Sequence, residues 1–401
     1  MENCFLGRRE LHQDMVKFSV LVVALVSFLG TFSAHAEDNK VPPFESQAKQ
    51  AILMDAKSGL VLYEKDADTA VPPASMSKLM TQALVFDALK KGTLKLDQQL
   101  PISENAWRKG GAVAGGSTMY AILHSNISVD DLLHGAIVQS ANDACIALAE
   151  ALAGSEQQFT KMMGDKAKVL GLEHSSFGNS TGLPDPLQRM SVKDLANLAR
   201  YIISTYPDYF KIYSQPEFTW NKITQQNRNP LLKDYPGADG MKTGYTKEAG
   251  YSMVGTATRD GRRLVMVVAG LPSINDRKVE AQKLLDWGFN QFKTISLYEA
   301  GDVVSRARVW GGSDHWVNLI TTDSVKVALS PTEQDRADVK MSYDGPLQAP
   351  VKAGATVGTM RILVDGKVIS EANLQTAGDV EAVDSIWAKA WDSALLMVFG
   401  S

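Results

Sequence analysis

Three short strings stand in one order along this chain: Ser75-Met76-Ser77-Lys78, Ser140-Ala141-Asn142 and Lys242-Thr243-Gly244. Any one of them alone means little, because a Ser-x-x-Lys match is common by chance and Lys-Thr-Gly can belong to an ordinary hairpin. The ordered, well-separated set is typical of a single acyl-transfer site. We therefore expect a fold that brings these three distant segments together.

The first string lies at the start of a predicted helix. Pro72 and Pro73 end a predicted hairpin over residues 50–71, and apolar residues then recur at helical spacing. Lys78 follows Ser75 by three residues, so both lie on one helix face and the amine can reach the hydroxyl. In this interpretation Ser75 is a nucleophile and Lys78 is its base, kept neutral by burial or by nearby positive charge. The alternative is that Ser75 caps the helix and Lys78 is solvated.

The second string interrupts two apolar helical runs with polar groups. Residues 129–138 have a helical pattern, and a second apolar run follows Asn142. A hydroxyl at Ser140 could relay a proton to a leaving amine, and the Asn142 amide could hold Lys78 and a substrate carbonyl in place. The alternative is that Ser140 and Asn142 only cap helices.

The third string precedes an alternating run, residues 250–255, and is predicted to begin a strand that lines a cleft. Thr243 offers a hydroxyl to a substrate carboxylate, and Lys242 offers positive charge. Gly244 lets backbone approach the substrate closely. A strand edge can also bind an extended peptide through main-chain hydrogen bonds.

With these residues the chain resembles the D-alanyl-D-alanine carboxypeptidases among the low-molecular-mass penicillin-binding proteins. The resemblance runs from about residue 45 to the C-terminus and includes residues 177–183 and 239–244. It implies an α/β (α+β) catalytic domain of the penicillin-binding/β-lactamase-like type with a helical subdomain. The implied divisions are a signal peptide (1–36), a serine D-Ala-D-Ala peptidase domain (37–295), a small all-β domain (296–378) and a C-terminal amphipathic, membrane-associating helix (379–401).

The resemblance also implies a role for single residues. The implied catalytic residues are Ser75, Lys78 and Ser140, and the implied substrate-binding residues are Asn142, Lys242, Thr243, Gly244, Tyr245 and Arg277. The backbone N–H groups of Ser75 and Tyr245 would form an oxyanion hole. Tyr245 stands where well-known members carry histidine, a change that leaves the backbone role intact. Arg277 would steer the terminal carboxylate of the substrate, and its alternative is an ordinary surface arginine of a helix.

The N-terminal segment has the pattern of an export signal. Basic residues precede an apolar run, residues 18–32, and Ala34-His35-Ala36 follows as a small-residue cleavage site. The run falls short of the ~20 residues that a membrane span needs. We therefore expect an exported protein and, from the resemblance, a periplasmic one on the outer face of the cytoplasmic membrane. Whether Met1 or Met15 is the true start stays open.

The C-terminal part has two further patterns. Alternating runs at residues 325–329, 339–343 and 360–364 predict the all-β domain, which we interpret as a spacer or contact module. The final helix has apolar side chains, two tryptophans among them, at helical spacing. The resemblance implies that this helix lies in the membrane interface, and the alternative is packing against the β domain. Acidic residues outnumber Lys389 there, which predicts weak attraction to anionic lipid.

Composition excludes several classes of function. The 401 residues are 45% hydrophobic and 21% charged with a formal net charge of -4, which indicates a globular protein and no nucleic-acid partner. After signal cleavage Cys145 is the one cysteine, and its apolar helical surroundings indicate a packed side chain rather than a nucleophile. The histidines are scattered, so we predict no metal site. No cofactor is implied.

The implied activity is that of a serine-type carboxypeptidase that removes the terminal D-alanine from peptidoglycan stem pentapeptides through an acyl-enzyme. β-Lactam antibiotics would acylate the same serine. The nearest alternatives are a peptidoglycan D,D-endopeptidase, a weak β-lactamase and a catalytically idle penicillin binder. A class A β-lactamase also needs a deacylating glutamate, and no clear loop bearing one occurs between Asn142 and Lys242. The preferred peptide and the oligomeric state stay open.

Overall fold

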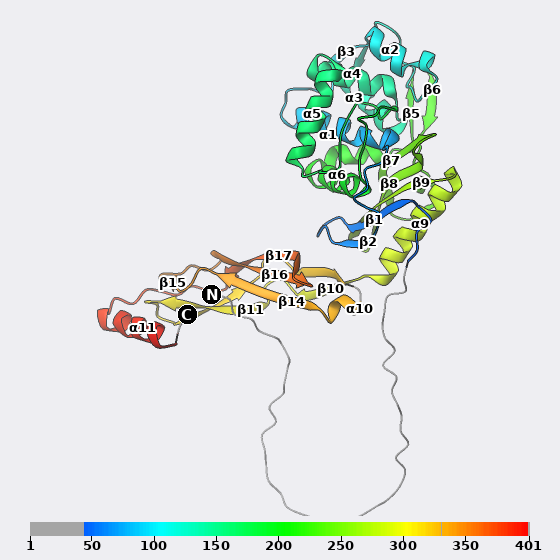
Figure 1. Cartoon of the computed structure of the whole chain (residues 1–401). Coiled ribbons are helices and arrows are strands. Elements are labelled where there is room, and N and C mark those ends of the chain that lie inside the picture. Colours follow the sequence, from blue (N-terminus) through cyan, green and yellow to red (C-terminus); the bar gives the residue numbers. More distant parts are fainter. Residues whose placement is uncertain (1–43, 330, 400–401) are drawn as a thin grey trace, which may run out of the picture. The chain divides into compact units, whose positions relative to one another are not determined.

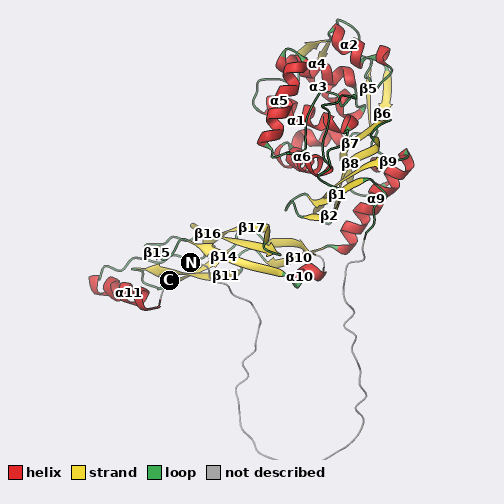
Figure 2. Cartoon of the chain, viewed as in Figure 1, coloured by secondary structure: helices red, strands yellow, loops and turns green. Residues whose placement is uncertain are grey.

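The computed structural model describes residues 44–329 and 331–399 (Figure 1 and Figure 2). The described chain forms two compact units, the first ending at Gln291 and the second beginning at Phe292. The predicted signal peptide, residues 1–36, lies outside the described residues.

The first unit contains a five-stranded antiparallel sheet with the strand order β2-β1-β9-β8-β7. The strands are β1 (Gln50–Asp55), β2 (Val61–Lys65), β7 (Ala238–Thr246), β8 (Gly250–Arg259) and β9 (Arg262–Leu271). β8 and β9 contain nearly continuous buried runs because both faces of the sheet are covered. The helix α9 (Ile274–Gln291) covers one face so closely that a Cβ on its Gly288 would touch Leu53 and Leu264.

Helices cover the other face of this sheet and form the helical subdomain (Figure 2). They are η1 (Ala74–Ser77), α1 (Lys78–Lys90), α2 (Glu104–Gly110), η2 (Ala112–Ala114), α3 (Val129–Val138), α4 (Asn142–Ala153), α5 (Glu156–Val169), α6 (Val192–Thr205), α7 (Pro207–Phe210), η3 (Lys211–Ser214) and α8 (Leu231–Asp234). Two small hairpins complete the unit, β3 (Gln99–Pro101) with β4 (Asn126–Ser128) and β5 (Glu217–Trp220) with β6 (Ile223–Gln226).

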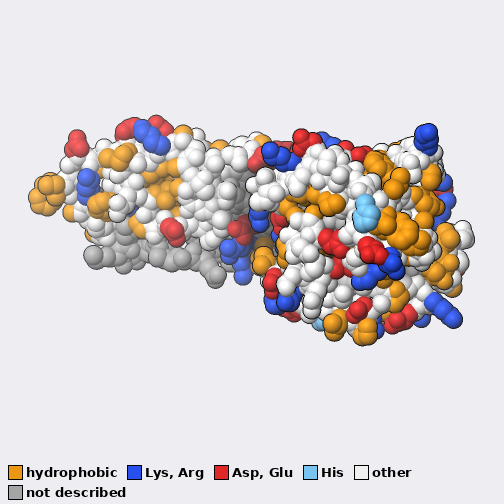
Figure 3. All heavy atoms as spheres, turned by 90° about the horizontal axis from the view of Figure 1, so that it is seen from above, with side chains coloured by type: hydrophobic (Ala, Val, Ile, Leu, Met, Phe, Trp, Pro, Cys, Tyr) orange, Lys and Arg blue, Asp and Glu red, His pale blue; other side chains and the backbone are white. Residues whose placement is uncertain are grey.

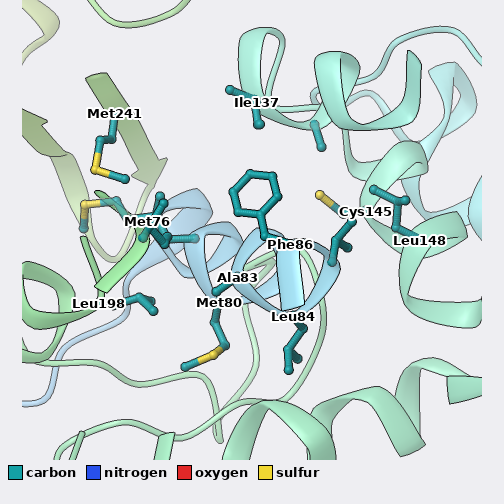
Figure 4. Packing of buried hydrophobic residues seen from close by; sticks show 14 of the residues in the cluster. Met76, Met80, Ala83, Leu84, Phe86, Ile137, Cys145, Leu148, Leu198 and Met241 are labelled. Atoms are coloured by element: carbon teal, nitrogen blue, oxygen red, sulfur yellow. The ribbon is translucent and has the colours of Figure 1, made fainter. Parts of the chain in front are cut away.

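The helix α1 runs through the middle of the main core (Figure 4). Its Phe86 lies in one cluster with Cys145 of α4 and Ile137 of α3, and all three side chains are buried. All residues of α1 from Lys78 to Phe86 are buried, polar ones among them. The first residues of α1 therefore lie inside the molecule, and the prediction that Cys145 is a packed side chain is confirmed.

The second unit is predominantly β structure, as predicted. A six-stranded sheet has the order β14-β16-β17-β12-β11-β15, and β10 pairs with β13. The strands are β10 (Lys293–Tyr298), β11 (Val303–Trp310), β12 (Trp316–Ile320), β13 (Val325–Leu329), β14 (Ala337–Tyr343), β15 (Leu347–Gln348), β16 (Thr356–Val364) and β17 (Lys367–Thr376), with the short helix α10 (Pro331–Gln334) after β13. Asp365 and Gly366 both have positive φ and form the turn between β16 and β17.

The predicted C-terminal helix is α11, which begins at Ile386 and ends at Phe399. Asp392 turns inward and is 2% exposed, whereas Trp387 and Trp391 are 84% and 67% exposed. Hydrophobic side chains are visible on the second unit where α11 lies (Figure 3). Among the described helices none has the length and apolar content that a membrane crossing requires.

Candidate active site

The fold joins Ser75 and Lys78 at the buried start of α1. The Nζ atom of Lys78 donates a hydrogen bond to Ser75 Oγ over 2.9 Å, and it also donates to Asn142 Oδ1 over 2.7 Å and to the Thr181 carbonyl over 2.6 Å. Lys78 is fully buried, whereas Ser75 is half-buried and so can be reached from outside. The alternative in which Lys78 is a solvated helix lysine is therefore wrong.

The local backbone explains how Ser75 is presented. The predicted helix starts as the 3₁₀ turn η1, which carries Ser75, and the α-helical part begins at Lys78 itself. Ser75 makes no cap to the helix, since neither helix start has a side-chain capping bond. Its hydroxyl is therefore available to Lys78 and to a substrate.

Burial sets the charge state of Lys78. It lowers the pKa of this amine to about 8, and the positive charge of Arg228 acts in the same direction. A neutral amine has two N–H groups and one lone pair. With the N–H groups donated to Asn142 and Thr181, the lone pair would accept the Ser75 proton.

The second string joins the third across the site. Ser140, with a φ of 62°, stands in the break between α3 and α4, and its Oγ accepts a hydrogen bond from Lys242 Nζ over 2.8 Å. Lys242 also donates to the Thr243 carbonyl over 3.0 Å. Ala141, without a side-chain cap, precedes α4, so the interpretation of Ser140 and Asn142 as mere helix caps is wrong. Burial lowers the pKa of Lys242 well below its usual value, with Lys78 adding to the effect.

The third string lies on β7, the strand at one edge of the sheet. It occupies the middle of a strand that begins at Ala238, earlier than predicted, because the preceding residues already pair with β8. A Cβ on Gly244 would lie 2.9 Å from the Pro73 carbonyl. Glycine is thus needed here for close approach to the segment that carries Ser75. The sequence analysis had predicted that Gly244 allows close approach of the backbone to a substrate instead.

Arg277 and two tyrosines form a stack beside this strand. The Tyr245 and Tyr251 rings stack at 4.3 Å between centroids, and the Arg277 guanidinium lies 5.7 Å from the Tyr251 ring centroid. Arg277 is 7% exposed, so its alternative interpretation as a surface arginine is wrong. Burial lowers its pKa to about 10. Within the described residues it has no ion pair, and its Nε has no hydrogen-bond partner, which leaves it able to take an anion.

Comparison with known proteins decides the family. Residues 35–273 match the family model of the D-alanyl-D-alanine carboxypeptidases, peptidase family S11. The chain belongs to this carboxypeptidase family. Residues 292–382 match the model of the C-terminal domain of penicillin-binding protein 5.

Single relatives agree with this assignment to the carboxypeptidases. The D-alanyl-D-alanine carboxypeptidase DacA of Haemophilus influenzae is 39% identical over 395 residues, which cover 96% of this chain and 99% of that protein. The crystal structure of penicillin-binding protein 5 from the same organism aligns with a TM-score of 0.73 and 38% identity, over 85% of this chain and 100% of that one. Penicillin-binding protein D2 from Listeria monocytogenes in its ampicillin-bound form aligns with a TM-score of 0.54 and 33% identity, over 62% and 99%. The predicted family, fold class and serine-type carboxypeptidase function are confirmed.

Sequence reasoning missed the Thr181 carbonyl, the third acceptor of Lys78 in this carboxypeptidase. Residues 177–183 were included in the resemblance. The role of a backbone carbonyl does not depend on the residue type, so the sequence could not reveal it. Asn179 Oδ1 accepts hydrogen bonds from the backbone N–H groups of Thr181, Gly182 and Leu183 and so holds the loop in shape. Glu156 anchors the same loop through the Ser180 hydroxyl at 2.7 Å.

Two charged residues beside the second string were missed as well. Asp143 is buried and accepts hydrogen bonds from Thr118 Oγ1 at 2.6 Å and from the backbone N–H groups of Met119 and Ala121. Arg228 donates to Ser117 Oγ over 2.7 Å, from a segment far away in the sequence. The position of Asp143 directly after Asn142 is a sequence signal that could have revealed its role. No pattern of the sequence points to Arg228.

Proposed function

We propose that this chain removes the C-terminal D-alanine from peptidoglycan stem pentapeptides through an acyl-enzyme at Ser75. The observation that carries the proposal is the fully buried Lys78 amine at 2.9 Å from the Ser75 hydroxyl. A lysine with a pKa near the working pH can take the serine proton, which a solvated lysine cannot do.

In the acylation step, Ser75 Oγ attacks the carbonyl carbon of the penultimate D-alanine while Lys78 Nζ takes its proton. The negative charge on the carbonyl oxygen is stabilised by the backbone N–H groups of Ser75 and Tyr245. The bond to the nitrogen of the last D-alanine then breaks, and that nitrogen receives the proton that Lys78 took from Ser75, relayed through the Ser140 hydroxyl. Because Ser140 Oγ accepts from Lys242, its own hydroxyl proton is free to point at the leaving amine.

In the deacylation step, water attacks the ester carbon while the Lys78 amine, neutral again, takes a proton from it, and Lys78 returns that proton to Ser75 Oγ as the ester bond breaks. The class A β-lactamases use a glutamate to activate this water. Here, no hydrogen bond among the described residues joins a glutamate to Ser75 or to Lys78, and the Thr181 carbonyl lies beside the amine instead. The weak β-lactamase alternative is for this reason not favoured.

The cationic groups around the site supply recognition of the substrate's terminal carboxylate. Lys242 and Thr243 face the site from β7, and the charge of Arg277 reaches Lys242 strongly enough to lower its pKa. A buried guanidinium without a partner strongly favours binding of an anion. In the same way, the carboxylate of a β-lactam would be held while its ring acylates Ser75.

The chain acts, in this proposal, outside the cytoplasm at the outer face of the cytoplasmic membrane. The export signal predicted for residues 1–36 takes it there, and α11 lies in the membrane interface. Trp387 and Trp391 point to solvent, as side chains that enter the interface would. The β domain would serve as the spacer between this helix and the catalytic unit.

The test is the release of D-alanine by residues 37–401 from a pentapeptide that ends in D-Ala-D-Ala. Ser75→Ala should abolish the release, and Ser214→Ala, which changes an exposed serine, should leave it unchanged. Covalent labelling by a fluorescent penicillin should follow the same pattern. If the folded wild-type protein releases no D-alanine but cleaves a cross-linked peptide dimer, the D,D-endopeptidase alternative holds instead.

A further inference from the structure

A row of two arginines and a tryptophan lies on the outer side of the β11–β12 hairpin. Arg306 and Arg308 are two residues apart on β11 and so project to the same face of the sheet, and Arg308 pairs across the strands with Trp316. The two guanidinium carbons lie 5.8 and 5.6 Å from the centre of the Trp316 ring. Trp316 is 43% exposed. We call these three residues the Arg–Trp–Arg row.

The positive charge of this row has no counter-ion in the described part of the chain. No ion pair there includes Arg306 or Arg308, and no side-chain hydrogen bond compensates either guanidinium. The Nε atom of Arg308 is buried and has no hydrogen-bond partner among the described residues. The nearby carboxylate of Asp314 accepts the backbone N–H of Trp316. Two like charges on one aromatic ring repel one another, so an added anion would stabilise the arrangement.

The same hairpin also holds α11. Trp310, the next residue of the β11 row after Arg308, donates from Nε1 to Ser393 Oγ of α11 over 3.1 Å. Gly311 N, in the hairpin turn, donates to Asp392 Oδ2 over 2.8 Å, and His315 Nδ1 lies 3.0 Å from the other oxygen of that carboxylate. The row and α11 are thereby joined through the same hairpin.

The inward position of Asp392 changes the electrostatic argument drawn from the sequence. The prediction of weak attraction to anionic lipid counted Asp392 among the exposed acidic groups, but its carboxylate is buried against the hairpin. Lys352 pairs with both Glu381 and Asp379, and Asp314 and Asp384 are exposed, so acidic groups also remain on this unit. The unpaired charges that this end of the unit offers include Arg306 and Arg308, which are positive.

We propose that the Arg–Trp–Arg row binds the phosphate groups of anionic phospholipids and is a second membrane contact beside α11. A guanidinium can donate two parallel hydrogen bonds to a phosphate, and tryptophan favours the headgroup level of a bilayer. The α11 tryptophans supply apolar insertion, and the row supplies selectivity for negative charge. The inference rests on the proposed membrane association of α11. Binding through the row should depend on lipid charge, whereas binding through the α11 tryptophans should not.

The test is co-sedimentation of residues 37–401 with vesicles of phosphatidylcholine alone and of phosphatidylcholine containing phosphatidylglycerol. Arg306→Gln/Arg308→Gln should weaken binding to the anionic vesicles about 30-fold, since each basic residue near such a surface contributes about fivefold. Binding to the neutral vesicles should stay as in the wild type. Trp387→Ser/Trp391→Ser should weaken binding to both kinds of vesicle.

The matched control is Lys326→Gln/Lys340→Gln, which removes two exposed positive charges elsewhere in the same unit. It should lower binding to anionic vesicles far less than the arginine pair does. Circular dichroism melting would show that each variant is folded. The proposal would be overturned if the arginine variant bound anionic vesicles as well as the wild type does, or if the lysine control lost as much binding as the arginine variant. It would also be overturned if the wild type bound no vesicles. So would loss of binding to isolated cell-wall sacculi with lipid binding intact, because the row would then recognise glycan.

Discussion

Lys78 Nζ lies 2.9 Å from Ser75 Oγ and donates two further hydrogen bonds, to Asn142 Oδ1 and to the Thr181 carbonyl. Three acceptors around one amine match the three protons of an ammonium group. Asn142 Oδ1 and the Thr181 carbonyl oxygen can only accept hydrogen bonds, so they keep theirs when the amine loses one proton. The Ser75 hydroxyl can also donate, so its proton turns toward the lone pair of the amine. In the proposed mechanism, this arrangement selects Ser75 as the group that is deprotonated.

The pH dependence of the reaction follows from this amine. Because the free enzyme needs neutral Lys78, kcat/KM should rise about tenfold per pH unit below the pKa of about 8 and level off above it. The measurement is the rate of acylation by a fluorescent penicillin between pH 6 and pH 9.5. A profile that is flat over this range would contradict the role of Lys78 as the base.

Arg228 should control the position of that profile. Its positive charge lowers the pKa of Lys78, so Arg228→Gln should move the rising limb of kcat/KM to higher pH. Arg228→Lys keeps the charge and should leave the midpoint in place. If Arg228 merely supported Ser117 through its hydrogen bond, both variants would change the height of the profile without shifting its midpoint.

Arg277 should act on substrate binding through the terminal carboxylate. Arg277→Gln should raise KM and lower kcat/KM about 10- to 100-fold, as expected for the loss of a charged hydrogen bond. A peptide with an amidated C-terminus should be processed equally by the variant and the wild type. Lys283→Gln, which removes an exposed charge from the same helix, serves as control. An equal loss with the amidated peptide would argue for a purely structural role.

Gly182 should be essential for the shape of the site. It has a φ of +78°, and a Cβ there would lie 1.9 Å from the carbonyl oxygen of Ala74, next to Ser75. Gly182→Ala should therefore displace the nucleophile and slow acylation on the order of 100-fold. Gly92, with a φ of +71° and open space around it, is the matched control. Gly92→Ala should cost about 1–2 kcal/mol of stability and leave the acylation rate unchanged.

Much of the architecture could be predicted because short-range patterns specify it. The helix expected at residues 129–138 is α3, and the strands expected at residues 325–329, 339–343 and 360–364 lie in β13, β14 and β16. Boundaries were less accurate where tertiary pairing extends an element. β7 begins at Ala238 because β8 pairs with its first residues.

Residue type and local spacing were enough to predict which side chains carry the chemistry, with Ser75 as nucleophile, Lys78 as base and Lys242 as cation. Tertiary structure alone decided how those groups behave. Burial makes Lys78 a base near neutral pH, the Thr181 carbonyl completes its surroundings, and Asp392 turns away from solvent. These outcomes depend on desolvation and on contacts between segments far apart in the chain, and neither quantity is encoded in any local pattern of residues.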